Sequence, residues 1–206
     1  MMNILIVDDH SIVREGLRTR IQLTFPEAQI QEASSVKDAL KAMAVTRYNG
    51  VLLDYQLQDG NAMDVIHALE SFEHRPAILI LTAFEDDRII YQCVQSGVEG
   101  ILLKTSDPRR ILDAIQAVLV GSTYYDEAIL HKMVCYVKRK DEIQRVLNDN
   151  ECRILKHLSS GLSNQDIANQ MFMSEKTIRN YLSVIYEKIG VKNRTEAVLY
   201  YQQHVK

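Results

Sequence analysis

Cysteine is scarce in this chain of 206 residues, and long apolar runs are missing. The cysteines are scattered and follow no metal-ligand or redox spacing, so we expect incidental thiols in a reducing cytosol. They are Cys93, Cys135 and Cys152. No run approaches the roughly 18 apolar residues of a transmembrane helix, which argues against a membrane span. The N-terminus lacks the charged segment and the cleavage site of a secretory signal, so we expect a cytoplasmic protein.

What the chain does contain is an uneven distribution of charge. Hydrophobic residues make up 47% of it, which is enough for the cores of one or two domains. Residues 1–120 carry 11 Lys and Arg against 17 Asp and Glu, whereas residues 147–206 carry 8 against 6. An acidic half followed by a mildly basic one predicts two modules with different partners.

The first 120 residues alternate between strand and helix signals five times. Four short apolar runs indicate buried parallel strands, at residues 3–7, 50–53, 78–81 and 100–103. Helical patterns lie between and after them, at about residues 11–24, 35–46, 61–72, 86–96 and 108–120. Ser35 and Asp107 are placed to cap two of these helices. Five units of a strand followed by a helix predict an α/β fold with a doubly wound parallel sheet.

Polar side chains end or directly follow each of the four apolar runs. They are Asp8, Asp9, Asp54, Thr82 and Lys104. In an open α/β sheet, ligands bind beyond the carboxyl ends of the strands, so we expect these side chains to converge. Clustered carboxylates repel one another, and Mg²⁺ relieves that repulsion because it prefers oxygen ligands. A carboxylate can also act as a nucleophile and form an aspartyl-phosphate, for which Asp54 is the best candidate.

Lys104 and Thr82 complete this predicted phosphoryl-transfer site. The Lys104 amine would neutralise phosphoryl oxygens, and the Thr82 hydroxyl would donate a hydrogen bond to one of them. Each residue taken singly has a simpler interpretation, because Asp and Thr are ordinary turn and cap residues at strand ends. The combination of all five residues on four strands is what favours the site.

Four motifs give residues 1–120 a resemblance to the receiver domain of bacterial two-component response regulators. They are Val7-Asp8-Asp9-His10, Leu53-Asp54 followed by Asp59-Gly60, Leu81-Thr82-Ala83 and Leu103-Lys104. The resemblance implies a flavodoxin-like five-stranded sheet and a histidine-kinase phosphohistidine that donates its phosphoryl group to Asp54. It also implies Mg²⁺ held by Asp9, by Asp54 and, through water, by Asp8.

The sequence departs from the receiver pattern at three positions. Ile101 stands where an aromatic residue usually acts as a rotameric switch, and Thr105 and Gln58 stand where proline is common. These changes leave the acceptor chemistry intact and call the aromatic part of the switch into question. We further expect Gln56 and Phe84 to border the site and to shield the acyl phosphate from water.

From residue 147 onward the sequence indicates four short helices and no strand. Their starts carry capping residues at Asn148, Ser163, Ser174 and Asn193. Four short helices in about 60 residues predict a compact helix-turn-helix module. Before it, residues 123–146 form a connector with a helix expected at about residues 126–140.

The third of these helices, from Ser174 to about Lys188, has one apolar and one polar face. Its apolar face repeats at helical spacing, with Ile178, Leu182, Ile185 and Ile189. Its opposite face collects Lys176, Arg179, Asn180, Ser183 and Glu187. Arg and Asn suit bidentate contacts with guanine and adenine edges in a major groove. The alternative is an ordinary solvated helix face.

A longer pattern resembles the LuxR-type helix-turn-helix over about residues 147–204. It consists of Leu162-Ser163-Asn164-Gln165-Asp166-Ile167-Ala168, Ser174 with Thr177-Ile178, and Lys188-Ile189-Gly190-Val191 with Asn193-Arg194-Thr195-Glu196-Ala197. The resemblance implies base contacts by Arg179, Asn180 and Ser183. It implies contacts with the phosphate backbone of DNA by Lys176, Thr177, Lys188 and Lys192. Apart from the resemblance, Ser174, Lys176 and Thr177 lie at the helix N-terminus, where free N–H groups and the helix dipole attract phosphate. The resemblance also implies dimerisation through the helix at about residues 194–204, with Val198 and Tyr201 as candidate contacts.

Together these features predict a two-component response regulator of the LuxR-type (NarL-like) family. Its expected parts are a receiver domain at residues 1–122, a partly helical linker at 123–146 and a DNA-binding domain at 147–206. We expect a sensor histidine kinase to phosphorylate Asp54, and a phosphorylation-dependent homodimer to bind double-stranded DNA and regulate transcription, without enzymatic turnover. Two alternatives stay open: a regulator of this architecture whose receiver is a fixed dimerisation platform, and a metal-dependent phosphatase that uses an aspartyl-phosphate.

Overall fold

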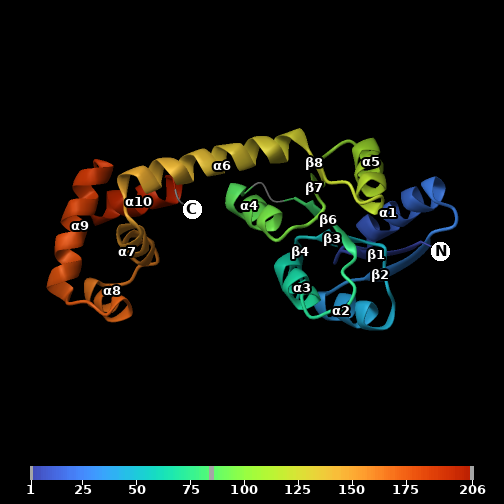
Figure 1. The fold of residues 1–206 in the computed structure, drawn as a ribbon, viewed down its shortest axis with the longest axis horizontal. Coiled ribbons are helices and arrows are strands. Elements are labelled where there is room, and N and C mark those ends of the chain that lie inside the picture. Colours follow the sequence, from blue (N-terminus) through green and yellow to red (C-terminus); the bar gives the residue numbers. More distant parts are fainter. Residues whose placement is uncertain (1, 84–85, 205–206) are drawn as a thin grey trace. The chain divides into compact units, whose positions relative to one another are not determined.

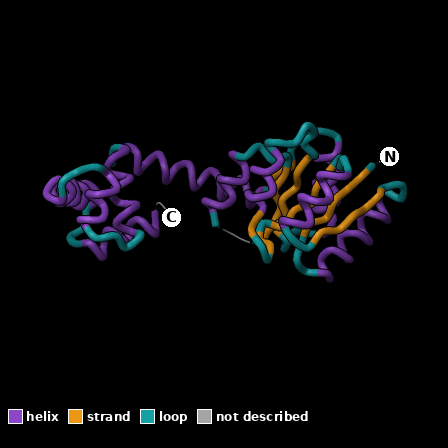
Figure 2. The backbone as a smooth tube through the Cα atoms, turned by 90° about the horizontal axis from the view of Figure 1, so that it is seen from below, coloured by secondary structure: helices purple, strands orange, loops and turns teal. Residues whose placement is uncertain are grey.

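The computed structural model describes residues 2–83 and 86–204. The chain divides into two compact units, with the division between Met133 and Val134. The first unit contains strands and helices, whereas the described part of the second unit contains helices alone (Figure 2).

A six-stranded parallel sheet, with the strand order β2-β1-β3-β6-β7-β8, forms the centre of the first unit (Figure 1). Its strands are β1 (Asn3–Val7), β2 (Gln29–Ala33), β3 (Gly50–Asp54), β6 (Ala77–Thr82), β7 (Gly100–Leu103) and β8 (Tyr124–Tyr125). The helices that connect or follow them are α1 (Ser11–Thr24), α2 (Val36–Val45), α3 (Ala62–Leu69), α4 (Asp87–Gln95), α5 (Pro108–Leu119) and α6 (Glu127–Val146). The expected doubly wound parallel sheet is therefore confirmed.

Side chains that alternate along the strands build a separate core on each face of the sheet. Leu5, Leu53 and Ile80 point to one face, where they pack with residues of α2, α3 and α4. Ile4, Leu52 and Leu79 point to the other, where they pack with α1 and α5. Because helices cover both faces, the central strands β1, β3, β6 and β7 are largely apolar along their length, which is the pattern of the four apolar runs, whereas the edge strand β2 is mostly polar.

The sheet has one strand more than the five expected, and the sixth comes from the stretch assigned to the linker. Strand β8 pairs in parallel with β7, and the Tyr124 amide donates to the Glu99 carbonyl at 2.8 Å. The Tyr125 hydroxyl donates to the Val98 carbonyl at 2.7 Å. Gly100 permits this close pairing, because a Cβ there would lie 3.0 Å from the Tyr124 carbonyl oxygen. The connector thus begins as part of the sheet.

Two expected helix caps are present in the first unit. The Ser35 side chain accepts from the Asp38 amide at the start of α2. The Asp107 side chain accepts from the Arg109 amide at the start of α5, with Pro108 as the first helical residue. Both caps satisfy amide groups that the first turn of a helix leaves unpaired.

The second unit packs four helices around a core of its own. They are α7 (Asp149–Ser159), α8 (Asn164–Met171), α9 (Glu175–Ile189) and α10 (Arg194–His204). Capping boxes at Asn148 and Ser163 and an N-cap at Ser174 start the first three helices, as expected. Helix α6 extends beyond residue 140, and Ile143 near its end belongs to this second core.

None of the helices over the described residues combines the length and the apolar character that a membrane crossing requires.

Candidate functional site

The predicted acidic site lies at the carboxyl ends of three adjacent strands. Asp8 directly follows β1, Asp54 ends β3 and Thr82 ends β6, and these strands are neighbours in the sheet. All three residues are buried, with 1%, 6% and 2% of their surfaces exposed. Strand β1 also pairs with β2, so the site lies where the strand order reverses. The sheet topology therefore brings together residues that are up to 74 positions apart, the separation between Asp8 and Thr82.

Lys104, which directly follows β7, joins two of the carboxylates. Its Nζ donates to Asp8 Oδ2 at 2.6 Å and to Asp54 Oδ2 at 2.7 Å. Its backbone amide donates to the Thr82 carbonyl at 2.8 Å, which holds the lysine at the end of its strand. One ammonium group thus bridges two buried carboxylates across the site.

Burial and the neighbouring charges alter the titration of this pair. Burial raises the pKa of Asp54, and the hydrogen bond from Lys104 offsets only part of that rise, to which the Asp8 charge adds. For Lys104, burial acts to lower the pKa, but the two carboxylates outweigh it and the pKa is raised. Lys104 therefore stays an ammonium, while the Asp54 carboxylate is more basic than an exposed one.

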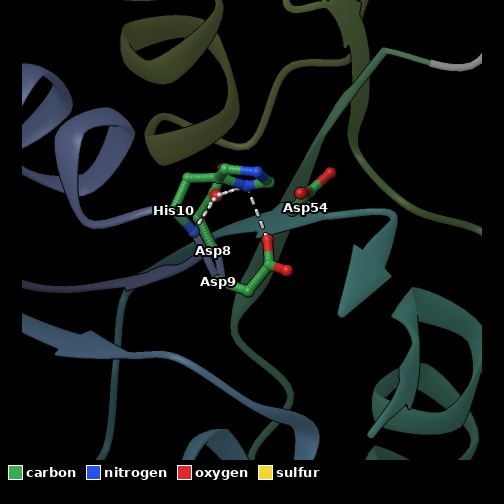
Figure 3. Close-up of side chains that lie close together, drawn as sticks. All are labelled: Asp8, Asp9, His10 and Asp54. Carbon is green, nitrogen blue, oxygen red and sulfur yellow. Dashed lines mark hydrogen bonds and ion pairs between the residues drawn. The ribbon is translucent and has the colours of Figure 1, made fainter. Parts of the chain in front are cut away.

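Asp9 leaves an oxygen that a cation could use. Its Oδ1 is buried and accepts no hydrogen bond from the described residues. The His10 Nδ1 lies 2.7 Å from this oxygen and becomes its charge partner only when the imidazole is protonated. Ligand atoms of Asp8, Asp9, His10 and Asp54 all lie within 4.8 Å of one another (Figure 3). An acidic cluster with an unsatisfied buried oxygen fits a hard divalent cation, which prefers oxygen ligands.

The polar face of α9 is the second predicted site, and most of its residues are exposed. Lys176, Arg179, Asn180 and Ser183 are exposed. Ile178, Leu182 and Ile185 on the other face are buried in the core. The Arg179 guanidinium lies 3.6 Å from Glu175 Oε1, an exposed pair that leaves it accessible. The N-cap Ser174 and Lys192, which lies beyond α9, are also exposed.

Comparison with known families decides what these two sites belong to. The model described as "Response regulator receiver domain" matches residues 4–116. The model described as "Bacterial regulatory proteins, luxR family" matches residues 145–201. The chain is a response regulator. Its receiver domain contains the acidic site, and its LuxR-type domain contains α9.

Known response regulators resemble this one over their whole length. VraR of Staphylococcus aureus is 29% identical over 203 residues, which cover 98% of this chain and 97% of VraR. A structure of RcsB from Salmonella typhimurium has a TM-score of 0.71 at 21% identity and covers 98% of this chain and 100% of RcsB. The response regulator ChrA of a heme-sensing two-component system has a TM-score of 0.56 at 29% identity, covering 98% of this chain and 96% of ChrA.

The structure shows the surroundings of residues that depart from the receiver pattern or were expected to border the site. Ile101 is 1% exposed and packs in the core on the α2–α4 face of the sheet, so an aliphatic side chain fills the position of the aromatic switch. No cis peptide bond occurs among the described residues, in accord with Thr105 in place of a proline. Gln56 is exposed in the short strand β4 (Gln56–Leu57), which pairs with β5 (Gly60–Asn61). Phe84 lies outside the described residues.

Arg14 is a residue of the response regulator site that sequence reasoning missed. Its Nη1 donates to the Asp8 carbonyl at 2.7 Å, and its Nε donates to Glu32 Oε2 at 3.0 Å. Only 16% of the Arg14 side chain is exposed. The arginine therefore ties the turn that carries Asp8 and Asp9 to strand β2. Nothing in the sequence marks Arg14, because it resembles any charged residue on an amphipathic helix.

Several residues of the predicted DNA-binding set have partners inside the second unit. The Lys188 Nζ donates to both carboxylate oxygens of Glu151, at 2.8 Å each. The Thr177 hydroxyl lies 2.8 Å from the Ser174 hydroxyl, and its amide donates to the same oxygen. These contacts give Lys188 and Thr177 structural roles, and their contacts with DNA stay predictions.

Helix α10 contributes apolar side chains to the core and to the surface. Val198 and Tyr201, the candidate dimer contacts, are half-buried against the core of the second unit. Leu199 beside them is 50% exposed. The dimer contacts predicted on this helix stay predictions, and Leu199 is the more accessible apolar residue.

Proposed function

We propose that Asp54 accepts a phosphoryl group from the phosphohistidine of a sensor histidine kinase. In that step an Asp54 oxygen forms the new bond to phosphorus, and the bond from phosphorus to the kinase imidazole nitrogen breaks. The carboxylate becomes an acyl phosphate, and the imidazole leaves with its electron pair and takes up a proton. The response regulator then carries the phosphoryl group as a signal and is not an enzyme that turns over a substrate.

The contact that carries this proposal is the Lys104 bridge between Asp8 and Asp54. A lysine within hydrogen-bond reach of the acceptor can neutralise the oxygens of the incoming phosphoryl group as a point charge. The raised pKa of Asp54, which burial causes, makes this carboxylate more basic than an exposed one. Buried Thr82 lies at the end of the next strand, where its hydroxyl can bind a phosphoryl oxygen.

Mg²⁺ is the cation that this site would hold, through Asp9 and Asp54 directly and through Asp8 by way of water. The buried Asp9 Oδ1, which accepts no hydrogen bond from the described residues, supports this assignment. When bound, the ion would neutralise the charge that accumulates on the phosphoryl oxygens. His10, whose amide donates to Asp8 Oδ1 at 2.9 Å, helps to hold the acidic turn in place.

The output of the signal, in this proposal, is binding of double-stranded DNA by a dimer. Helix α9 is 15 residues long, which at 1.5 Å per residue is about 22 Å and suits a major groove. RcsB of Salmonella enterica has been solved bound to a promoter in the presence of a phosphomimetic. Another structure contains two RcsB dimers bound to two parallel DNAs. We propose that this chain likewise binds DNA, forms a dimer and is located in the cytoplasm.

A second candidate function is a regulator with this architecture whose DNA binding ignores phosphorylation. Buried Ile101 favours it, because the aromatic switch residue is replaced by an aliphatic side chain in the core. The complete set of three carboxylates, Lys104 and Thr82 favours phosphorylation instead.

The deciding experiment incubates the wild type and Asp54→Asn with acetyl phosphate and Mg²⁺. Intact mass, oligomer size and affinity for promoter DNA are then measured on the same samples. We expect one added phosphoryl group, a larger oligomer and tighter DNA binding for the wild type alone. A wild type of unchanged mass would refute the phosphoacceptor function, and a phosphorylated wild type with unchanged DNA affinity would support the second candidate.

A further inference from the structure

We infer that Asp126 is a positioning residue that joins the loop of Lys104 to the first turn of α6. We call the hydrogen bonds of Asp126 with Ser106, with Arg110 and with the first turn of α6 the clasp. Through the clasp, phosphorylation of Asp54 would alter α6, the helix that leads into the DNA-binding domain. The inference rests on the proposed function, and it names the contacts through which phosphorylation of Asp54 would be transmitted to α6.

The carboxylate of Asp126 accepts hydrogen bonds from two elements beside the site. Ser106 Oγ donates to Asp126 Oδ2 at 2.8 Å, and Arg110 Nη1 donates to Asp126 Oδ1 at 2.8 Å. Asp126 is 7% exposed. Burial acts to raise its pKa, but the bonds from Ser106, the Ala128 amide and Arg110 outweigh burial and lower the pKa. A buried, ionised carboxylate with these donors holds their positions tightly.

The backbone of Asp126 forms the start of α6. Its carbonyl accepts from the Leu130 amide at 3.0 Å, which is the first turn of hydrogen bonding in the helix. Its carboxylate also accepts from the Ala128 amide at 3.4 Å, and its own amide donates to the Ile101 carbonyl at 3.4 Å. Asp126 therefore occupies the N-cap position of the connector helix and anchors it to β7.

The other end of the clasp lies in the segment that directly follows Lys104. Ser106 lies two residues after Lys104, in a turn closed by the hydrogen bond from its amide to the Leu103 carbonyl at 2.9 Å. The Lys104 amide is bonded to the Thr82 carbonyl, so Lys104 and Ser106 sit in one short, hydrogen-bonded segment. A phosphoryl group on Asp54 would compete with Asp8 for the Lys104 ammonium. A resulting shift of this segment would move the Ser106 hydroxyl and thereby change its hydrogen bond with Asp126.

The clasp also fits the residue found at the switch position. Ile101 has no hydroxyl with which to exchange hydrogen bonds, and its side chain is enclosed in the core. Its backbone carbonyl, however, receives the Asp126 amide. A polar contact through Ser106 and Asp126 thus supplies a connection that an aliphatic side chain at position 101 lacks.

The test uses the full chain and follows hydrogen exchange of the α6 amides from 128 to 132. It compares the wild type, Ser106→Ala and Arg110→Ala, each with and without acetyl phosphate and Mg²⁺. Arg109→Ala is the matched control, because Arg109 is exposed in the same turn, and among the described residues it is Arg110, not Arg109, whose guanidinium bonds to Asp126. Ser106→Thr keeps the hydroxyl and should restore the wild-type behaviour. Asp126→Asn retains an acceptor for Ser106 and loses the charge that pairs with Arg110.

In the wild type and in Arg109→Ala, we expect phosphorylation to change the exchange of these amides. In unphosphorylated Ser106→Ala, loss of one hydrogen bond should speed the exchange roughly fivefold. Phosphorylation should then leave that exchange unchanged, although Asp54 takes up its phosphoryl group as fast as in the wild type. The phosphorylation-dependent gain in DNA affinity should fall in Ser106→Ala and Arg110→Ala and return in Ser106→Thr.

The outcomes separate this inference from the proposed function. A wild type that takes up no phosphoryl group overturns the proposed function and the clasp with it. Alternatively, the wild type is phosphorylated, and Ser106→Ala and Arg110→Ala show the same changes in α6 amide exchange and in DNA affinity. That result overturns the clasp alone. A Ser106→Ala that is phosphorylated much more slowly than the wild type also overturns it, because the hydroxyl would then act on the acceptor chemistry.

Discussion

Lys188 near the end of α9 holds Glu151 in the first turn of α7 through two hydrogen bonds of 2.8 Å from one Nζ. The Glu151 side chain is 4% exposed, and its Oε2 also accepts from the Asn148 amide. Burial acts to raise the pKa of Glu151, but Lys188 and the Asn148 amide outweigh burial and lower it. A residue predicted to bind DNA phosphate thus stabilises the helix-turn-helix itself.

We expect Lys188→Met to destabilise the second unit by about 1–3 kcal/mol. Loss of one partner from a fully buried pair costs about 3–5 kcal/mol, and the 37% exposure of the Lys188 side chain reduces that cost. Thermal unfolding of the full chain provides the measurement, with Glu151→Gln and the double variant completing a cycle. Additive effects of the two substitutions would show that the pair does not stabilise the fold.

The same pair predicts how stability depends on pH. Because folding lowers the pKa of Glu151, its contribution is present above the usual value of 4.5 and is lost as pH falls through the lowered value. The wild type should therefore lose its advantage over Glu151→Gln in acid. Unfolding midpoints of both proteins between neutral and acidic pH measure this, and a constant difference would contradict it.

Asp54→Asn should raise the stability of the receiver domain at neutral pH by about 1 kcal/mol, within the ordinary range of single substitutions. Folding raises the pKa of Asp54, chiefly through burial, so the carboxylate contributes stability below its usual value of 3.8 and loses it as pH rises. The advantage of the variant should therefore vanish in acid. Urea unfolding at several pH values measures the effect, and a less stable variant at neutral pH would contradict it.

Arg14→Ala should weaken Mg²⁺ binding roughly tenfold, since residues that orient metal ligands affect affinity by about 10- to 100-fold. The reason is the hydrogen bond from Arg14 to the Asp8 carbonyl, which fixes the turn of Asp8 and Asp9. Isothermal titration with MgCl₂ measures the affinity. Arg20→Ala, an exposed change on the same helix, is the control. Equal affinities of the two variants would leave Arg14 without a role at the metal.

Lys176→Ala and Arg179→Ala should affect DNA binding in different ways. If Lys176 binds phosphate, its loss should reduce the salt dependence of binding by about one ion and weaken all sequences alike. If Arg179 reads a base, its loss should cost about 1–3 kcal/mol and relax specificity at one position. Titrations at several salt concentrations, with promoter and unrelated DNA, distinguish these effects. Equal losses on both DNAs for Arg179→Ala would exclude base reading.

Local patterns in the sequence determined much of this protein. Apolar runs that end in polar residues predicted four strands, and their carboxyl ends meet at one edge of any parallel sheet. Asp8, Asp54 and Thr82 could therefore be placed together from the sequence. Capping residues such as Ser163 predicted the helix starts, because a cap acts within three residues.

Only the tertiary structure decided which partners those residues have. Lys104 and Asp8 are 96 positions apart, and their 2.6 Å contact depends on how far each strand extends in the sheet. Strand β8 is two residues long, too short for any periodic signal, and Gly100 permits its close approach to β7. The bonds of Lys188 to Glu151 and of Asp126 to Ser106 likewise join separate elements. A side chain that is charged in the sequence has no known partner until the packing of whole elements places one beside it.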